Sequence, residues 1–214
     1  MIILVLNCGS SSAKYQVLDM KGEGEAKVLA KGIVERIGMK EGLLTHKPSG
    51  KDKYEVSAPI PDHTVAINMI LEALVDPSHG VLESLSQIDA VGHRVAHGGE
   101  YFADSAVVTP DVKKKIESCF ELAPLHNPAN MKGVEAVEKI MPGTPQVTAF
   151  DTSFHQTMPR ENFIYPIPYE YYEKYRVRRY GFHGTSHKYV AAKACKITGV
   201  DLNNSKIITC HIGN

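Results

Sequence analysis

A turn near the amino terminus gathers more hydrogen-bond donors than a turn requires. Residues 7–14 run Asn-Cys-Gly-Ser-Ser-Ser-Ala-Lys, so an amide, three hydroxyls and an ammonium group follow an apolar run. Gly9 lets the backbone approach a ligand closely, and successive backbone N–H groups in such a turn can surround an anion. The pattern favours a phosphate-binding turn, and the alternative is a serine-rich surface turn with no ligand.

Polar side chains also stand where later apolar runs end. With the first turn included, they are Asn7, Arg94, Asp151, His211 and Asn214. Ligands of α/β sheets bind outside the carboxyl ends of the strands, so these positions favour one shared ligand site. Taken singly, each has a structural interpretation, because Arg94 could pair with Glu100 and Asp151 could cap the next turn.

Hydrophobic periodicity predicts the strands that must position these side chains. Residues 2–16 predict a β-hairpin with Ala13, Tyr15 and Val17 on one face. Further strands are predicted at residues 27–34, 42–46, 88–95, 146–150 and 206–212. The early strands follow one another directly and the later ones alternate with helices, which indicates an α/β fold.

Capping residues predict where the helices begin. Asp62 can cap one helix, residues 110–122 predict a second, and Asn127 followed by Pro128 predicts the N-cap and first position of a third. A last helix opens after residues 180–187 and ends at Gly199. The residues predicted to face the core are Ile67, Ile70, Leu71 and Leu74 in the first helix, Val134, Val137 and Met141 in the third, and Val190, Ala194 and Ile197 in the last.

The composition argues against several classes of partner and site. The chain of 214 residues has 24 Lys and Arg against 24 Asp and Glu, so its charge favours neither nucleic acid nor a membrane surface. No apolar run has the length of a membrane span, and the start lacks the basic region of a signal peptide. Four cysteines without paired spacing indicate reduced thiols in a cytoplasmic protein and argue against zinc: Cys8, Cys119, Cys195 and Cys210.

Six blocks of the sequence, in order along the whole chain, resemble the acetate kinase family. They are residues 7–14 as given above, 92–100 (Gly-His-Arg-Val-Ala-His-Gly-Gly-Glu), 125–128 (Leu-His-Asn-Pro), 150–155 (Phe-Asp-Thr-Ser-Phe-His), 179–187 (Arg-Tyr-Gly-Phe-His-Gly-Thr-Ser-His) and 211–214 (His-Ile-Gly-Asn). The last block reads as the beginning of a further phosphate-type loop. We therefore expect this chain to correspond to the amino-terminal half of a longer protein.

The resemblance implies an actin/hexokinase-like (ribonuclease H-like) two-domain phosphotransferase fold, here truncated. Residues 1–151 would form the domain with the phosphate loop and the acyl-substrate side, and residues 152–214 would begin the nucleotide-side domain. The implied reaction is reversible, direct in-line phosphoryl transfer from ATP to acetate, giving acetyl phosphate and ADP with Mg²⁺ or Mn²⁺. The family usually forms homodimers. Because half of the cleft would be absent, we expect the 214-residue chain alone to be inactive.

The resemblance also implies catalytic roles for Arg94, Asp151 and His183. The Arg94 guanidinium would hold the acetate carboxylate or a phosphoryl oxygen, and His183 would donate a hydrogen bond to the transferring group. Acetate has a pKa of about 4–5, so at neutral pH no group has to deprotonate it. Asp151 is therefore expected to orient Arg94 or a metal-bound water rather than to act as a base.

The remaining implied contacts divide into three groups. Acetate would meet Arg94, Ala96, Leu125, His126 and Phe182. The nucleotide phosphates would meet Ser10, Ser12, Lys14, His211, Gly213 and Asn214. Asn7 would face the metal and its waters, because Mg²⁺ prefers oxygen ligands and keeps several waters.

Ala96 stands where the family commonly has valine. If it lines the slot for the substrate methyl group, the slot is wider and propionate is better tolerated, unless neighbouring side chains close the gap. A propionate or butyrate kinase is therefore one alternative. The other is a catalytically inactive fragment or binding module with an actin-like fold, since folds of this kind also serve non-enzymatic roles.

Overall fold

The computed structural model describes residues 1–22 and 25–213. Its strands form one mixed sheet in the order β5-β4-β3-β2-β1-β6-β8-β7. In chain order they are β1 (Ile2–Cys8), β2 (Ser12–Gly22), β3 (Glu25–Glu35), β4 (Gly42–Pro48), β5 (Tyr54–Ala58), β6 (Ile88–Val95), β7 (Ala106–Val107) and β8 (Gln146–Phe150).

Within the described residues, α1 to α3 alternate with the later strands along the chain, and α4 to α6 come after the last strand. The α-helices are α1 (His63–Val75), α2 (Pro110–Glu117), α3 (Asn127–Ile140), α4 (Arg160–Phe163), α5 (Glu170–Tyr175) and α6 (Gly184–Thr198). Short 3₁₀ turns lie between them at η1 (Leu85–Gln87), η2 (Phe120–Leu122), η3 (Ser153–Thr157) and η4 (Leu202–Asn204).

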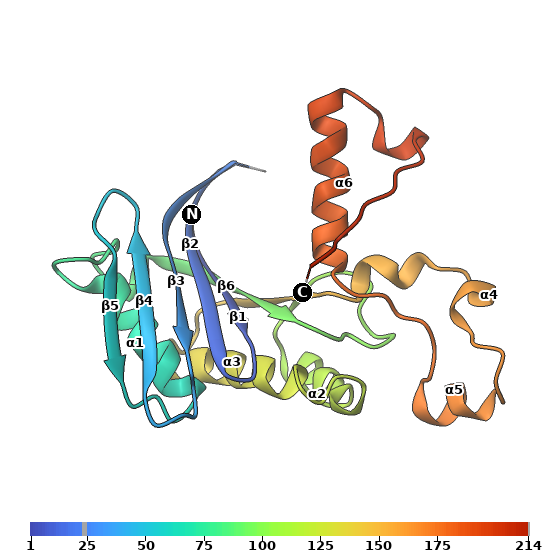
Figure 1. The fold of residues 1–214 in the computed structure, drawn as a ribbon, viewed down its shortest axis with the longest axis horizontal. Helices are drawn as coiled ribbons and strands as arrows, with labels where there is room; N and C mark the ends of the chain where they lie inside the picture. Colours follow the sequence, from blue (N-terminus) through green and yellow to red (C-terminus); the bar gives the residue numbers. More distant parts are fainter. Residues whose placement is uncertain (23–24, 214) are drawn as a thin grey trace.

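The sheet combines an antiparallel and a parallel half. Strands β1 to β5 form an antiparallel meander, which contains the predicted hairpin with Asn7 opposite Lys14. Strands β6 and β8 then continue the sheet parallel to β1. Because parallel strands end at the same edge, the residues after β1, β6 and β8 lie next to one another. Figure 1 shows this arrangement of β1 beside β6.

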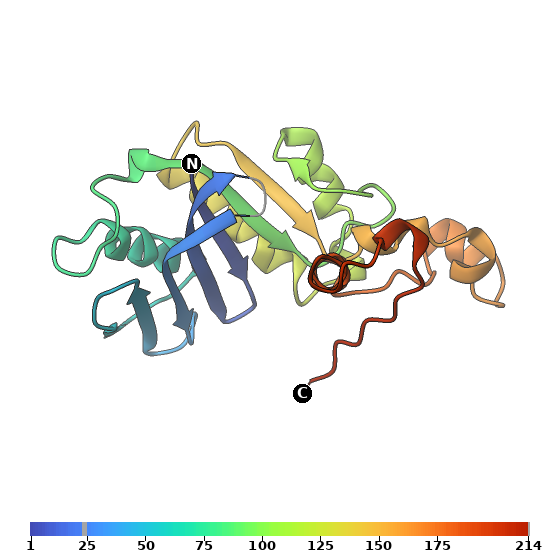
Figure 2. The same ribbon diagram turned by 90° about the horizontal axis from the view of Figure 1, so that it is seen from above.

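Helices α1 and α3 pack together on one face of the sheet (Figure 2). The Asp62 carboxylate caps α1 by accepting a hydrogen bond from the Val65 N–H at 2.9 Å. The predicted apolar stripes of α1 and α3 are buried, as is the predicted hairpin face of Ala13, Tyr15 and Val17. Burial of these side chains is the main contribution to the stability of this layer.

Two predicted helix boundaries differ from the structure. The helix predicted over residues 110–122 is divided, because α2 ends at Glu117 and the turn η2 follows. Asn127, predicted as an N-cap, is the first residue of α3, and His126 precedes it. The Asn127 side chain bonds to the backbone of His97 instead of to the start of its own helix, which explains the shift.

The segment after β8 corrects two further predictions. Val190 and Ile197 of α6, expected to face inward, are 46% and 73% exposed, and Ala194 is exposed as well. Figure 1 shows α6 standing away from the sheet, so no second layer in the described part of the chain covers this face. Residues 206–212 do not form the predicted strand. An extended segment needs a neighbouring strand to pair its backbone groups, and the described residues supply none here.

All four cysteines are free thiols, with Cys8, Cys119 and Cys195 buried and Cys210 exposed.

Within residues 1–22 and 25–213, no helix has both the length and the apolar character needed to cross a membrane.

Candidate active site

Arg94 and Asp151 are joined at the carboxyl edge of the parallel strands. Arg94 lies near the end of β6 and Asp151 directly follows β8. The Nε and Nη2 atoms of Arg94 donate to Oδ2 of Asp151 at 3.1 and 2.6 Å. The carboxylate therefore holds one edge of the guanidinium plane. The alternative partner, Glu100, instead pairs with Arg178 at 2.6 Å.

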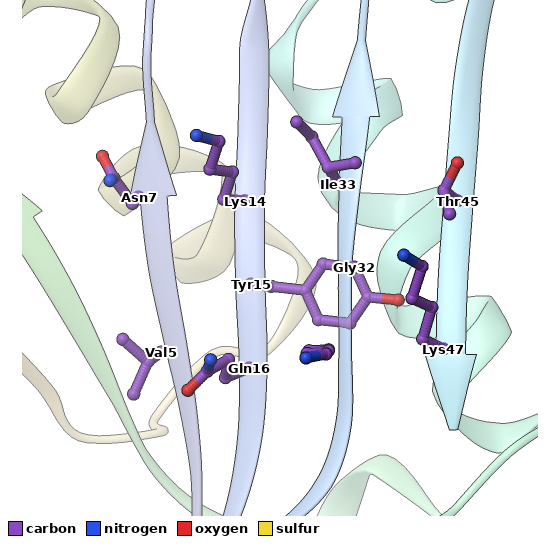
Figure 3. A pocket seen from close by; sticks show the side chains of 10 residues that line it. Val5, Asn7, Lys14, Tyr15, Gln16, Gly32, Ile33, Thr45 and Lys47 are labelled. Atoms are coloured by element: carbon purple, nitrogen blue, oxygen red, sulfur yellow. The ribbon is translucent and has the colours of Figure 1, made fainter. Parts of the chain in front are cut away.

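Asn7 and Lys14 are cross-strand partners on the sheet face opposite α1 and α3. Both are exposed, whereas their neighbours Cys8 and Ala13 are buried against the helices. They lie on a hollow of about 410 Å³ (Figure 3). The hollow is lined by two rows of cross-strand neighbours, with Tyr15 and Gly32 between them. One row is Asn7, Lys14, Ile33 and Thr45, and the other is Val5, Gln16, Lys31 and Lys47. Its lysines make this end of the sheet attractive to anions.

The turn after β1 is closed by its own backbone. The Gly9 N–H donates to the Ser12 carbonyl at 2.7 Å. Ser10 is exposed and Ser12 is half-buried. The turn thus occupies the same strand end as Asn7, beside β6 and its Arg94, which is where a phosphate loop is expected.

His97 is a buried residue of the site region that the sequence analysis did not single out. The Asn127 side chain bonds to both its N–H and its carbonyl, at 3.0 and 2.8 Å. The Gly99 N–H donates to Nδ1 of His97, which must therefore accept. Burial, and the charge of Arg176 to a smaller extent, lower the pKa of His97 to about 4. The imidazole is neutral at physiological pH and serves as a fixed packing surface.

The residues expected around acetate differ in how far they are exposed to solvent. Leu125 and Phe182 are 75% and 48% exposed, and His126 is also exposed at the start of α3. Phe182 packs edge-on against His97, with ring centroids 5.6 Å apart. Ala96, by contrast, is only 1% exposed. Its methyl group is covered by neighbouring side chains, and its place beside the substrate methyl group stays a prediction.

His183 lies at the start of α6 in the left-handed region, with φ 56° and ψ 25°. This conformation is uncommon outside glycine, although histidine adopts it more readily than most residues, and Arg36 and Arg176 also have positive φ. The next residue, Gly184, donates its N–H to the Asp151 carbonyl at 2.8 Å. A side chain at Gly184 would meet that carbonyl, since a Cβ there would lie 2.4 Å from it. The absence of a side chain at Gly184 therefore lets α6 begin directly beside β8.

His211 stacks beside His183, with ring centroids 4.2 Å apart and a tilt of 32°. Its Nδ1 also lies 3.1 Å from the Ser186 hydroxyl. Gly213 is exposed near the end of the chain. Asn214, predicted to bind nucleotide phosphate, lies outside the described residues.

The side chains near the site that sequence reasoning missed are mostly buried polar groups. They are His63 of α1, His97 after β6, and Asn130 of α3. One signal was present in the sequence, because Asn127 and Asn130 are spaced i, i+3 and continue the buried stripe of Val134 and Val137. A polar pair in an otherwise apolar stripe indicates a specific buried partner.

Comparison with known proteins agrees with this arrangement. A family model described as the acetokinase family matches residues 2–214. Acetate kinases of Caldanaerobacter subterraneus subsp. tengcongensis and Thermoanaerobacter pseudethanolicus are 58% and 59% identical over the whole chain, which covers 53% of each. The chain thus spans about half the length of these curated relatives.

Solved structures give the same result. An acetate kinase of Porphyromonas gingivalis matches with a TM-score of 0.93 and 51% identity, covering 100% of this chain and 53% of that one. A propionate kinase of Francisella tularensis matches with a TM-score of 0.84 and 41% identity, covering 92% and 49%. The chain therefore belongs to the acetokinase family and has about half of its actin/hexokinase-like fold.

Proposed function

We propose that this chain is the phosphate-loop and acyl-substrate half of an acetate kinase. The complete enzyme would transfer the γ-phosphoryl group of ATP directly and reversibly to acetate. The observation that carries the proposal is the Arg94–Asp151 pair, which lies at the shared carboxyl edge of β1, β6 and β8 beside the Gly9–Ser12 turn. Family membership and the names of the relatives support it.

Arg94 is the residue that would hold the reacting groups in line. Asp151 occupies its Nε and Nη2 edge, so the plane of the guanidinium is fixed. The rest of the fork can then bind the acetate carboxylate or an equatorial oxygen of the transferred phosphoryl group. Phosphoryl transfer requires mainly such positioning and charge neutralisation.

The proposed step needs no general base. An acetate oxygen forms a bond to the γ-phosphorus, the bond from that phosphorus to the bridging oxygen of ADP breaks, and no proton changes place. Asp151 is accordingly assigned the orientation of Arg94. His183, whose backbone is fixed beside β8, would donate a hydrogen bond to the transferring group.

The donor set of the turn fits a nucleotide phosphate and a divalent metal. Ser10, Ser12 and Lys14 supply hydroxyls and a positive charge for phosphate oxygens, and His211 with Gly213 lies on the nucleotide side. Asn7 supplies an amide oxygen, which suits Mg²⁺ or Mn²⁺ that keeps most of its waters. The metal would neutralise phosphate charge when bound.

We place the domain boundary after Asp151, where the sheet ends, so that residue 152 begins the nucleotide-side domain. In the complete enzyme we expect a homodimer, as is usual in this family. The free thiols fit a reducing compartment such as the cytoplasm. Propionate kinase activity is the second candidate, because a propionate kinase is among the similar structures at 41% identity.

The test compares a full-length protein carrying these residues with the 214-residue chain, each checked by intact mass. We expect acetate-dependent ADP release from the full-length protein and none from the shorter chain. Specificity for acetate follows if kcat/KM for acetate exceeds that for propionate and butyrate. Full turnover by the 214 residues alone would contradict the division of the cleft, and a full-length protein without turnover would contradict the proposed activity.

A further inference from the structure

Four carbonyl groups of the phosphate-loop turn, those of Cys8, Gly9, Ser11 and Ser12, are occupied by donors within the protein. The Cys8 carbonyl accepts from Nδ2 of Asn130 at 2.5 Å, and the Gly9 carbonyl bonds to Nε2 of His63 at 2.7 Å. The Ser11 carbonyl accepts from the Ile37 N–H at 3.0 Å, and the Ser12 carbonyl accepts from Gly9. These donors come from α3, α1, the segment after β3 and the turn itself.

This occupation matters because carbonyl oxygens repel phosphate. A turn can cradle an anion only if its carbonyl oxygens point away and its N–H and hydroxyl groups point toward the ligand. The peptide units of residues 8–11 could otherwise rotate, since the turn contains Gly9 and small serines. Donors behind the turn fix the carbonyl side and thereby leave the donor side facing outward.

His63 is suited to this task by burial and by its place in α1. It is 5% exposed and is the first helical residue, directly after the Asp62 N-cap. A carbonyl oxygen can only accept, so Nε2 of His63 must carry the proton in this bond. The helix start therefore presents one defined donor to the Gly9 carbonyl.

Asn130 holds the turn from the other side and links it to β6. It is 1% exposed, and its Oδ1 accepts from the Ala96 N–H at 3.0 Å while its Nδ2 donates to the Cys8 carbonyl. The two partners fix the orientation of the amide, because one can only donate and the other can only accept. One side chain thus sets the turn after β1 relative to the segment that follows Arg94.

We propose that His63 and Asn130 are positioning residues for phosphoryl transfer, which keep the carbonyls of Gly9 and Cys8 turned away from the nucleotide phosphates. The proposal rests on the proposed kinase function. It predicts that the two side chains act on nucleotide binding and transfer without touching the nucleotide.

The test uses three variants of the full-length kinase. His63→Phe removes the donor, His63→Gln restores a donor near the position of Nε2, and Asp62→Ala weakens the start of the same helix without touching the turn. We expect His63→Phe to lower kcat/KM for ATP by about tenfold or more, with KM for acetate nearly unchanged, as lost transition-state positioning requires. His63→Gln should restore most of the loss. Asp62→Ala should lower Tm but retain kcat/KM for ATP.

A second measurement covers the case in which His63→Phe does not fold. Asn130→Asp keeps the acceptor for the Ala96 N–H but replaces the donor to Cys8, so it should produce the same loss of kcat/KM for ATP. Amide hydrogen exchange of a peptide covering residues 6–14 should be faster in the positioning variants and unchanged in Asp62→Ala.

Three results would overturn the inference: an equal loss of kcat/KM for ATP in Asp62→Ala, no rescue by His63→Gln, or unchanged exchange of residues 6–14 in the positioning variants. Absence of acetate-dependent turnover in the parent would refute the proposed function instead, and the exchange measurement would still decide whether the two side chains hold the turn.

Discussion

Asp151 controls Arg94 through a single carboxylate oxygen. Both bonds from Arg94 fall on Oδ2, and the Asp151 side chain is only 8% exposed while that of Arg94 is 30% exposed. A partly buried, charge-assisted pair of this kind holds the guanidinium more firmly than an exposed ion pair would. The chemistry at this scale therefore depends on a negative charge behind the arginine.

Replacing Asp151 by Asn tests that dependence. The variant keeps the shape but loses the charge, so Arg94 is held less well, and a small displacement of a positioning group can cost about 10²-fold in rate. We expect kcat/KM for acetate in the full-length kinase to fall by about that factor. Asp111→Asn removes a carboxylate from an exposed pair with Lys115 and is the matched control. Equal activity in the two variants would refute the orienting role.

A substitution at Ala96 tests whether this residue contributes to packing or to substrate specificity. It is 1% exposed, and Asn130 bonds its N–H. We expect Ala96→Val to overpack this position and to lower the free energy of unfolding by about 1–3 kcal/mol. Denaturant unfolding measures this loss, and the ratio of kcat/KM for acetate and propionate should stay unchanged. A changed ratio with unaltered stability would show instead that residue 96 lines the acyl slot.

At the scale of elements, the contact between α3 and β1 sets the position of Asn130. Gly133 lies one turn after Asn130 on the same helix and faces Cys8. A Cβ at residue 133 would lie 2.7 Å from the Cys8 Sγ atom, closer than real contacts allow. The glycine therefore lets α3 approach β1 closely enough for the Asn130–Cys8 bond to form.

Gly133→Ala should destabilise the protein although alanine favours helices. The gain in helix propensity is about 1 kcal/mol, and the clash with Cys8 should cost about 1–3 kcal/mol. We expect a net loss in denaturant unfolding of the full-length protein. In the double variant with Cys8→Ala the clash is removed, so adding Gly133→Ala to Cys8→Ala should cost much less. Equal costs in both backgrounds would contradict this account.

At the scale of the whole molecule, two buried histidines link stability to pH. Burial lowers the pKa of His93 to about 4, and its Nε2 bonds Oε1 of Gln146 at 2.6 Å. The pKa of His97 is also lowered to about 4, mainly by burial. In the unfolded chain each histidine has a pKa of about 6.5, so the folded state favours the neutral form of both.

The sign of the effect follows from these values. Each histidine makes its full contribution to the free energy of unfolding above about pH 6.5. Between about pH 6.5 and pH 4 this contribution falls by roughly 1.4 kcal/mol per pH unit. We expect denaturant unfolding to show a lower free energy at pH 5 than at pH 7. His93→Gln should reduce this pH dependence. An unchanged pH dependence in His93→Gln would contradict the prediction.

The carboxyl-terminal part of the described chain carries apolar surface, as expected for a piece of the fold. Ile197 is 73% exposed, and Ile208 and Ile212 are each 91% exposed. Isolated apolar side chains are common on surfaces, but a group of large ones on one segment is typical of an interface. The relatives, which are about twice as long, have further residues that could cover them.

Local sequence was sufficient for β1 to β4, β6 and β8, although it missed β5 and β7 and predicted a strand over residues 206–212 that does not form. The alternation in β1, β2 and β6 depends only on neighbours along the chain, and so does the cap of α1 by Asp62. The order of the six motif blocks was sufficient for the family. Parallel strands then implied that Asn7, Arg94 and Asp151 would share one edge of the sheet.

Only the tertiary structure decided what lies behind the site and which faces are covered. Arg94 and Asp151 are 57 residues apart, and Asn130 and Cys8 are 122 residues apart, so no local pattern pairs them. The face of α6 looked apolar, yet it is exposed because no described segment packs against it. Periodicity records which side of an element is apolar, whereas the partner of that side is set by the packing of distant segments.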